Sequence, residues 1–585
     1  MRLLFPLAFA QLLCFATALN NGTILTPEID TFVANILADW NSSAGVAVAV
    51  VRQDGQGGWL VETKGYGTAK ADGTPVTPDT LFAIGSESKL FDISATGLLI
   101  SNQSLTPPID WTTKIGSIIP EWELMDPIAS NGSSIIDLMS HKTGMPRHDL
   151  SLGISDTALD IIKRMKYLKP SAEFRSKFQY NNLMYTTLSY LPTALLPSKP
   201  TFAQYVHDNI LEPLGMNSTT YSFQVANATN RLADGFGREG DTSMNPITQP
   251  SHSMPFWLQA GGTDGTTVVS GPGGVITSIN DFSIWLKMLI SNGLNPATNA
   301  TVIPADVLAT VTSGITVWPF TLPYPEVSVG TYGGAQYGSS YRGHDLIEHG
   351  GDVQGFHSMV TRFPYEGAGV AILINDDLYY LRDVIRYRII DELFGLDPVD
   401  WNTRQDGLLY QIAVETAEGT AAAVSTPRSA NATAPTGGFS SLVGNYSNPG
   451  YTSFELCLIV PPPSNASEAC TTLVNTLNSS FPAQIDYTVP TLAFTWDRTG
   501  QYVKLAHFDG NVFNMTGWTG MPTGNASSPV WAYDAGFTGT QVEFGVSTDG
   551  TTGFGFENGL WGAQDCPDPQ GNTAEERAEV WFTKA

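Results

Sequence analysis

Two hydrophobic patterns alternate along roughly the first four hundred residues. Continuous apolar runs at residues 46–51 and 369–374 are typical of strands that are buried on both faces. Residues 86–100 and 281–290 instead carry apolar side chains three and four positions apart, which predicts helices. Strands mixed with helices predict an α/β or α+β domain, which we place at residues 30–414.

The pattern changes after residue 414. Residues 415–438 read ETAEGTAAAVSTPRSANATAPTGG and show no sustained apolar period, so we predict a linker there. Beyond it, short runs rich in aromatic and β-branched residues are separated by Gly, Asn, Asp and Pro turns, at residues 451–460, 491–496, 502–507, 541–546 and 578–582. We therefore predict a second, all-β domain at residues 439–585, whose role the sequence leaves open.

The N-terminus predicts export from the cell. Arg2 precedes an apolar run that is too short to span a bilayer comfortably, and residues 16–18 (Ala-Thr-Ala) provide a small-x-small cleavage site. We expect a signal peptide at residues 1–18 and a secreted, extracellular protein. Glycosylation sequons recur along the chain, and we expect glycosylation where they face solvent. They include Asn41, Asn102, Asn131, Asn217, Asn227, Asn299, Asn431, Asn445, Asn465, Asn478, Asn514 and Asn525.

The cysteines fit the same compartment. Cys14 leaves with the signal peptide, and Cys457, Cys470 and Cys566 remain, all in the C-terminal quarter. Three cysteines in an oxidising compartment predict one disulfide and one leftover thiol, with the pairing open. No activating motif surrounds them, so we expect no cysteine catalysis.

Composition excludes several classes of function. The 585 residues include 29 Lys and Arg against 55 Asp and Glu, a formal net charge of −26 at pH 7. Such a charge repels nucleic-acid phosphates and anionic membrane surfaces, so we expect no nucleic-acid partner. After the signal peptide no stretch reaches about 18 uninterrupted apolar residues, so we expect no membrane span. No cluster of His, Cys and carboxylate residues has metal-ligand spacing, so we expect no metal and no cofactor.

A serine and a lysine lie one helical turn apart where the helix at residues 86–100 begins. In the sequence FAIGSESK, Ser86 and Lys89 share one face of that helix. A serine hydroxyl is a poor nucleophile, and a partly desolvated lysine can have its pKa lowered enough to take the proton. The helix N-terminus also presents backbone N–H groups to developing negative charge. Among the 13 lysines, only Lys89 follows a serine at this offset.

A tyrosine and an amide form a second element, Tyr180-Asn181-Asn182. A phenol near a lysine ammonium ionises more easily, so we expect Tyr180 to act as base and then acid, and Asn182 to hydrogen-bond a substrate carbonyl. A second Tyr-x-Asn, at residues 446–448, is followed by Pro449-Gly450, and we expect a turn there.

The third element is His349-Gly350-Gly351-Asp352, which precedes an apolar alternation at residues 356–363. The glycines let a substrate backbone approach closely, and His349 could carry charge or donate a hydrogen bond. We expect His349 to titrate near its ordinary pKa of about 6.5. A literal Lys142-Thr143-Gly144 precedes Tyr180 in the chain, and we interpret it as part of a structural loop.

Together these elements resemble the serine β-lactamase and penicillin-binding protein superfamily, and most closely its class C-like branch of carboxylesterases, D-aminopeptidases and D-Ala-D-Ala carboxypeptidases. Further stretches of the chain are similar to that family at residues 137–146, 273–281, 355–358 and 373–375, so the resemblance covers about residues 30–395. It implies an antiparallel sheet flanked by helices, with a helical subdomain.

The resemblance also implies roles for individual residues. Ser86 would be the acylated nucleophile, Lys89 and Tyr180 the proton-transfer pair, and Asn182 a substrate-orienting residue. The oxyanion hole would come from the backbone N–H of Ser86 and of a residue near Asp352. The partner would be a small-molecule or peptide substrate; the oligomeric state stays open.

Two features narrow the expected function. Where β-lactamases usually have Lys-Thr-Gly, this chain has His349-Gly350-Gly351, which resembles the esterase and peptidase members. The segment from residue 442 resembles the lipocalin-like barrel that some peptidase members carry. We therefore predict a secreted serine hydrolase that acts on an ester or amide through an acyl-enzyme. The alternatives are a β-lactamase or acyltransferase with the same site, and a non-catalytic secreted binding protein on this scaffold.

Overall fold

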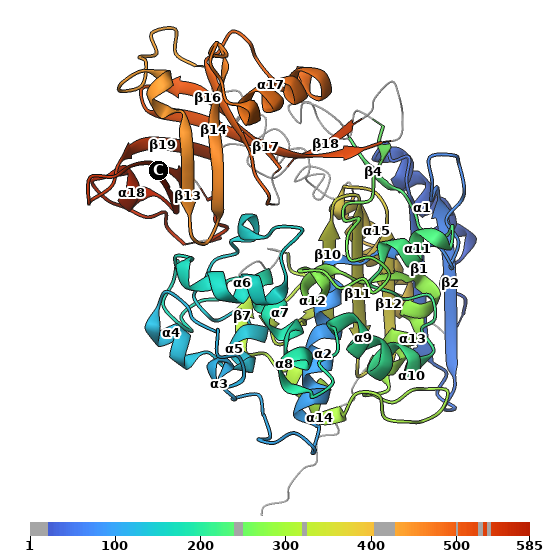
Figure 1. Ribbon diagram of the computed structural model, residues 1–585. Helices are drawn as coiled ribbons and strands as arrows, with labels where there is room; N and C mark the ends of the chain where they lie inside the picture. Colours follow the sequence, from blue (N-terminus) through green and yellow to red (C-terminus); the bar gives the residue numbers. More distant parts are fainter. Residues whose placement is uncertain are drawn as a thin grey trace, which may run out of the picture.

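The computed structural model describes residues 22–238, 250–318, 324–402, 428–498, 501–523, 530–534, 540–557, 559–564 and 566–585. The predicted signal peptide and residues 415–427 of the predicted linker lie outside this part of the chain. The described residues form an α/β part and a β-barrel that sits against its helical side (Figure 1).

The α/β part is built on one antiparallel sheet. Its strands follow the order β2 (Trp59–Gly67), β1 (Gly45–Gln53), β12 (Ala368–Ile374), β11 (Phe356–Phe363), β10 (His344–Val353), β9 (Tyr337–Tyr341), β8 (Gly330–Tyr332) and β7 (Thr316–Trp318). The two runs predicted as buried strands are β1 and β12, and they pair directly, with Val50 opposite Val370. The predicted fold class is confirmed.

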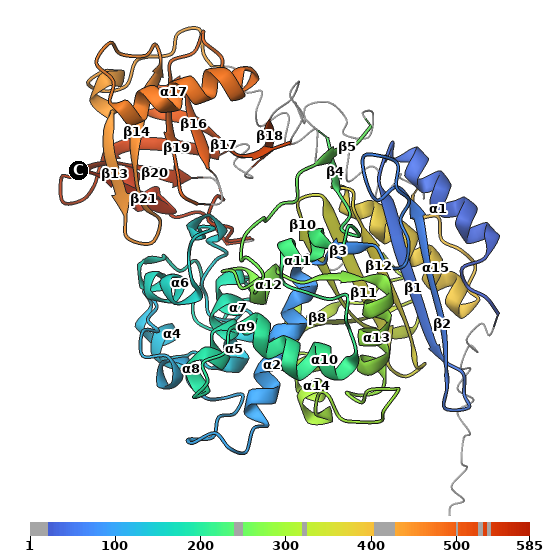
Figure 2. The same ribbon diagram turned by 45° about the vertical axis from the view of Figure 1, so that its right-hand side comes forward.

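Helices cover both faces of this sheet, as Figure 2 shows. On one face, α1 (Pro27–Asp39) and α15 (Tyr379–Phe394) pack against Val46, Val48 and Val50 of β1. On the other face, Ala47 and Ala49 belong to the core that contains α2 (Ser88–Ile100) and α13 (Ile279–Ile290). Because both faces are covered, β1 is apolar at nearly every position instead of alternating.

The remaining helices form the subdomain beside the sheet and its edges. They are α3 (Ile115–Ile118), α4 (Pro127–Gly132), α5 (Ile135–Met139), α6 (Ala158–Arg164), α7 (Asn182–Ser189), α8 (Leu191–Leu195), α9 (Phe202–Val206), α10 (Glu212–Leu214), α11 (Phe223–Ala228), α12 (Ser270–Gly273) and α14 (Ala305–Thr312). Two small sheets pair β3 (Leu81–Ala83) with β6 (Ile276–Ser278) and β4 (Gly235–Gly237) with β5 (His252–Met254).

The C-terminal part is a closed barrel of eight antiparallel strands. In chain order they are β13 (Gly444–Asn448), β14 (Thr452–Val460), β15 (Thr491–Thr495), β16 (Tyr502–Asp509), β17 (Val512–Pro522), β19 (Thr540–Val546), β20 (Thr552–Glu557) and β21 (Val580–Lys584). Each pairs with the next and β21 pairs with β13, while β18 (Val530–Asp534) extends β17. This is the up-and-down arrangement that lipocalins also use.

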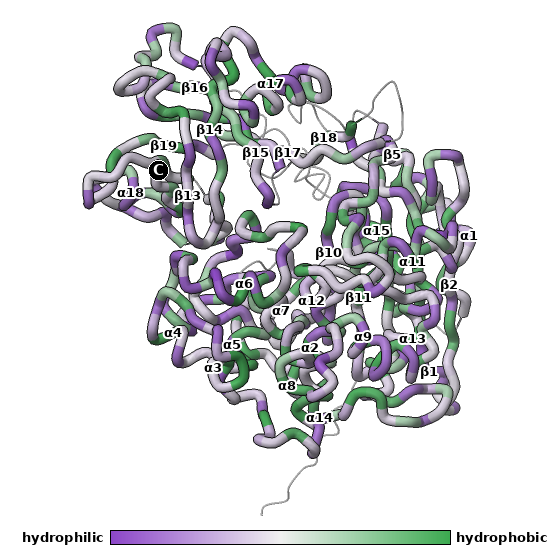
Figure 3. Tube along the Cα trace, viewed as in Figure 1, coloured by the Kyte–Doolittle hydropathy of each residue, from purple (hydrophilic) through white to green (hydrophobic). Residues whose placement is uncertain are grey.

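Aromatic rings fill the barrel. Phe454 stacks on Phe494 with ring centres 3.8 Å apart, and Phe554 stacks on Phe582 at 5.5 Å. Tyr446 is also buried there, so the second Tyr-x-Asn lies in barrel strand β13 instead of the predicted turn. Hydrophobic stretches run through both parts of the molecule (Figure 3).

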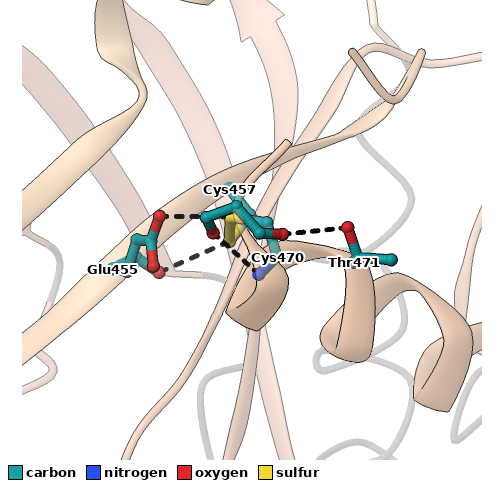
Figure 4. Close-up of a disulfide and its surroundings, with 5 residues drawn as sticks. Glu455, Cys457, Cys470 and Thr471 are labelled. Atoms are coloured by element: carbon teal, nitrogen blue, oxygen red, sulfur yellow. Dashed lines mark hydrogen bonds between the residues drawn. A yellow bond between two sulfur atoms is a disulfide. The ribbon is translucent and has the colours of Figure 1, made fainter. Parts of the chain in front are cut away.

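The all-β prediction for the C-terminal part missed a long helix, α17 (Glu468–Ser480). Ser467 caps it, and it buries Cys470, Leu473 and Leu477 against the outside of the barrel. Cys470 forms a disulfide with Cys457 of β14 (Figure 4), and Cys566 is a buried free thiol. The predicted count of one disulfide and one thiol is confirmed. A short helix, α18 (Ala574–Arg577), precedes β21.

The barrel docks on the α/β part around His148. The ring Nδ1 of His148 lies 2.6 Å from the Tyr451 hydroxyl of the barrel, and Nε2 lies 2.9 Å from the Lys169 carbonyl. A carbonyl only accepts, so Nε2 carries the proton and Nδ1 accepts from Tyr451. The His148 amide donates to the Trp561 carbonyl at 2.9 Å. Nearby, Arg498 of the barrel pairs with Asp156 at 2.8 Å.

No helix among the described residues is long and apolar enough to cross a membrane.

We predict that this docking weakens in acid. Burial lowers the pKa of His148 to about 4, whereas in the unfolded chain its pKa is about 6.5. The unfolded state therefore binds more protons, and stability is complete above pH 6.5 and falls as pH drops to about 4, by up to about 3 kcal/mol. Thermal unfolding from pH 7 to 4 measures this loss. His148→Gln should flatten the pH dependence, and a matching change at exposed His252 (His252→Gln) should not. An unchanged slope in His148→Gln would contradict the assignment.

Candidate functional site

The sequence places Ser86 where a strand turns into a helix. Strand β3 pairs with β6 and ends at Ala83, and the turn η1 (Gly85–Glu87) then leads into α2. The predicted helix over residues 86–100 therefore begins with a 3-10 turn, and regular α-helix starts at Ser88. Ser86 thus lies at the N-terminal end of a buried helix, whose free N–H groups favour negative charge.

Lys89 is the closest basic group to Ser86. Its Nζ lies 2.9 Å from Ser86 Oγ and donates to the Pro272 carbonyl at 2.8 Å. The side chain is fully buried, and its Nζ sits 4.7 Å from the centre of the Tyr180 ring. Burial lowers the pKa of Lys89 well below its usual value, because the charged ammonium is poorly solvated there. A neutral amine beside Oγ can accept the serine proton.

Tyr180 approaches Ser86 from the segment that precedes α7. Its hydroxyl donates to Ser86 Oγ at 2.8 Å. Burial raises the pKa of Tyr180 well above its usual value, which opposes the expectation that Tyr180 ionises readily. The geometry instead suits Tyr180 as a neutral proton donor, with Lys89 as the base.

Close backbone approach brings strand β10 against the turn that carries Ser86. Gly85 has φ +50°, and a Cβ there would lie 2.7 Å from the Asp352 nitrogen. A Cβ on Gly351 would lie 1.8 Å from the Ile84 carbonyl oxygen. Only glycine fits at either position, so these two residues let the end of β10 lie beside Ser86. This is the place where we expect the second oxyanion donor, near Asp352.

His349 lines the cleft but does not carry charge. Its Nδ1 donates to the Gly350 carbonyl at 2.6 Å, and its Nε2 lies 3.4 Å from the Tyr332 hydroxyl. Burial lowers the pKa of His349 to about 3. The expectation that His349 titrates near pH 6.5 is therefore wrong, because its ring is buried and both nitrogens face neighbours.

Asp352 stays ionised at the mouth of the cleft. Burial alone would raise its pKa, but Arg382 and His357 outweigh this and hold the pKa well below its usual range. The Oδ1 atom accepts from His357 Nδ1 at 2.7 Å and from Arg382 Nη1 at 3.2 Å. The acidic charge is thus balanced by its own partners.

Asn182 lies outside the cleft, contrary to the substrate-orienting role expected for it. Its Nδ2 donates to Asp149 Oδ1 at 2.9 Å. The other oxygen of Asp149 accepts from Arg147 Nε at 2.7 Å. Asn182 therefore fixes a carboxylate that in turn fixes Arg147.

The cleft around Ser86 has a volume of about 360 Å³. Of the predicted residues, Ser86, Tyr180, His349, Gly350 and Asp352 line it, whereas Gly351, Lys89 and Asn182 do not. Five further lining residues were missed from the sequence: Arg147, Phe178, Trp318, Tyr337 and Gln564. Phe178 lies two positions before Tyr180 and Arg147 follows the loop at residues 137–146, so proximity to motifs could have indicated both.

The interpretation of Lys142-Thr143-Gly144 as a structural loop agrees with its contacts. The neighbouring His141 accepts at Nδ1 from the Asn181 amide at 3.0 Å, and the Gly144 carbonyl accepts from Ser171 and Ala172. This loop holds the segment that carries Tyr180, and none of its three residues is among the described residues that line the cleft.

Within the described residues, one group of side chains is close enough together to hold a metal ion. His207, Asp208 and Glu212 lie close together, which the sequence spacing did not reveal, but all three are exposed and none lines the cleft.

Comparison with known proteins gives a consistent picture. A sequence model of the Beta-lactamase family matches residues 32–393. The Unguisins hydrolase ungD′ of Aspergillus campestris is 29% identical over 447 residues, covering 74% of this chain and 78% of that protein. Unguisins hydrolase ungD of Aspergillus violaceofuscus is 27% identical over 466 residues, covering 75% and 78%. The octameric penicillin-binding protein homologue from Pyrococcus abyssi has a similar fold, with a TM-score of 0.51 at 15% identity, over 91% of this chain and 98% of that one.

We predict that His349 stays neutral across the physiological range. With a pKa of about 3, its ring should keep one proton, on Nδ1, from pH 8 down to pH 5. Histidine-selective isotope labelling and NMR at several pH values would report this, because the chain has only 8 histidines and His349→Gln assigns the signal. A titration of that signal between pH 5 and 8 would contradict the structural assignment.

Proposed function

Because this chain belongs to the β-lactamase family, we propose that it is a serine hydrolase that acylates Ser86 with an ester or amide substrate. One observation carries the proposal: Lys89 Nζ and the Tyr180 hydroxyl both meet Ser86 Oγ, at 2.9 and 2.8 Å. A nucleophile held between a base and a proton donor is the arrangement that acyl transfer requires.

The reaction begins with proton transfer from Ser86 to neutral Lys89. Ser86 Oγ attacks the substrate carbonyl carbon, and the resulting oxyanion is stabilised by backbone N–H groups of Ser86 and of the residues near Asp352. The tetrahedral intermediate collapses, and the leaving oxygen or nitrogen takes a proton from Tyr180. The ammonium of Lys89 then returns its proton to Tyr180. Water repeats these transfers to release the acid and restore Ser86.

The cleft and the relatives support the proposed substrate class. Aromatic side chains of Phe178, Trp318 and Tyr337 line an open cleft, and no charged group stands at position 349. These features favour an ester or peptide over a β-lactam, for which a fixed cation on this strand is usual. The relatives named as hydrolases of unguisins support a hydrolase.

Three alternatives are weaker. Acyl transfer would use the same acyl-enzyme with another acceptor, and β-lactam hydrolysis would use the same nucleophile. A non-catalytic binding protein would be favoured by an empty barrel, but the rings of Phe454, Phe494 and Phe582 pack inside this one. A ligand-holding barrel needs an interior cavity that these side chains occupy.

We also propose that the protein is secreted, as its N-terminal sequence predicts. The disulfide between Cys457 and Cys470 is typical of an oxidising compartment. Every predicted glycosylation asparagine that the structure describes is at least partly exposed.

Removing the nucleophile tests the proposed function. Ser86→Ala should lower turnover of a short-chain p-nitrophenyl ester at least about a thousandfold and abolish covalent labelling by a fluorophosphonate. Ser88→Ala is the matched control, because Ser88 Oγ accepts from the Val275 amide at 3.0 Å instead of facing Lys89. Mass spectrometry should place the label on Ser86 in the wild type and in Ser88→Ala. Wild-type turnover by Ser86→Ala would refute the proposal.

The pH dependence separates the two partners of Ser86. Acylation needs neutral Lys89, so kcat/KM for a neutral ester should rise with pH through the lowered pKa of Lys89 and level off above it. Lys89→Met should remove the rise together with most of the activity. Tyr180→Phe should keep the rise and lose most activity toward a poor leaving group such as an amide, but less toward p-nitrophenolate, which needs no proton. Equal losses on both leaving groups would contradict the donor role.

A further inference from the structure

The cleft contains one fixed positive charge that the proposed acylation chemistry does not use. His349 is neutral, and the charge of Asp352 is balanced by Arg382 and His357. Among the described residues that line the cleft, Arg147 is therefore the only cation. A guanidinium stays protonated at all physiological pH values, so this charge is permanent.

The side chain of Arg147 is held with part of its donor set free. Its Nε donates to Asp149 Oδ2 at 2.7 Å, and its guanidinium carbon lies 5.1 Å from the centre of the Tyr180 ring. The side chain is 39% exposed, and Nη1 and Nη2 have no hydrogen-bond partner among the described residues. A planar fork of N–H donors matches the two oxygens of a carboxylate.

Gly562 of the barrel part contacts the backbone and the side chain of Arg147. The Arg147 amide donates to the Gly562 carbonyl at 3.3 Å, and a Cβ on Gly562, which has φ +71°, would lie 2.7 Å from Arg147 Cβ. The segment is itself fixed, because the Glu579 carboxylate accepts from the Gly559 and Trp561 amides. Two residues after Gly562, the side chain of Gln564 lines the same cleft.

Gln564 supplies a second polar group beside this cation. Its Oε1 is buried without a partner in the described part of the chain. A buried carbonyl oxygen without a donor is costly, and an N–H group of a bound substrate can satisfy Oε1.

We propose that Arg147 binds a carboxylate of the substrate and makes the enzyme selective for anionic esters or peptides, with Gln564 Oε1 beside it as the acceptor for a substrate N–H group. The inference rests on the proposed reaction at Ser86. It places anion recognition at Arg147 instead of on the strand that carries His349. One guanidinium fork matches a single carboxylate, which free peptide ends and acidic side chains provide. The barrel takes part in specificity by holding Arg147 through Gly562.

Two matched substrate pairs test the proposal and locate the carboxylate. On the acyl side, p-nitrophenyl hemiglutarate is compared with its carboxamide, p-nitrophenyl 4-carbamoylbutanoate. On the leaving-group side, the acetate ester of 4-hydroxybenzoate is compared with that of 4-hydroxybenzamide. The wild type should favour the carboxylate over the amide in kcat/KM in at least one pair, and that pair identifies the side. A ratio at or below one in both pairs overturns the proposal.

Substitutions at Arg147 separate charge recognition from support of Tyr180. Arg147→Gln should lower kcat/KM for the preferred anionic substrate about 10- to 150-fold, the range for hydrogen bonds to charged groups, and change its carboxamide little. Arg147→Lys should fall between, because it keeps the charge but loses the fork. Lys163→Gln, on the exposed face of α6, removes one positive charge elsewhere and should leave the ratio unchanged. Equal losses on both members of a pair would show a merely structural role.

Gly562→Ala tests the contribution of the barrel. The added methyl should displace Arg147 and reduce the carboxylate preference while sparing the neutral substrate. Gly550→Ala is the matched control, since Gly550 also has positive φ, +88°, with nothing within 4 Å of an added Cβ. An unchanged preference for the carboxylate substrate in Gly562→Ala would refute the proposed contribution of the barrel to selectivity. Fluorophosphonate labelling of Ser86 distinguishes the failures: no label refutes the proposed reaction, whereas labelling without charge preference refutes only the Arg147 assignment.

Discussion

The burial of Lys89 is the constraint on which the site depends. An amine in water at neutral pH is protonated and cannot take a proton from serine, so the fold must remove water from it. Helix α2 does so by being buried along nearly its whole length, from Ser88 to Gly97, with the Tyr180 and Tyr185 rings against the amine. Asp92, one turn further along α2, does not restore the charge, because burial raises its own pKa well above the usual value.

The same burial decides what the neighbouring groups can do. Tyr180 and His349 lie in the same water-poor surroundings, so the phenol keeps its proton and the imidazole stays neutral. In water a phenol beside an ammonium would ionise more easily, but a neutral lysine provides no such field. In the proposed reaction, desolvation thus outweighs charge attraction, so that Lys89 is the base and Tyr180 the proton donor.

Much of this site could be predicted from the sequence, because Ser86, Lys89 and Tyr180 belong to short motifs in a fixed chain order. The neutrality of His349 could not be, since it depends on Tyr332 and on burial that no local pattern reveals. Gln564 could not be predicted either. It lies beyond the predicted linker and lines the same cleft as Ser86 only because the barrel docks through His148 and Tyr451. Helix α17 was missed because its sequence, EACTTLVNTLNSS, is rich in Thr, Asn and Ser, which are weak helix formers. Its apolar spacing at Cys470, Leu473 and Leu477 carried the only signal.

Reactivity and selectivity therefore depend on different kinds of electrostatics. The protonation state of the reacting groups depends on how completely the fold excludes water from them. It therefore changes with pH and with any exposure of α2 to solvent. Arg147 and Asp352 keep their charges over a wide pH range, because Asp149 supports the first and Arg382 the second. A cleft arranged in this way can recognise the charge of a ligand independently of pH while its chemistry responds to pH. The barrel contributes to charge recognition alone. Within the described residues, it contacts Arg147 through Gly562 and lines the cleft with Gln564, whereas Lys89 is enclosed by the α/β part.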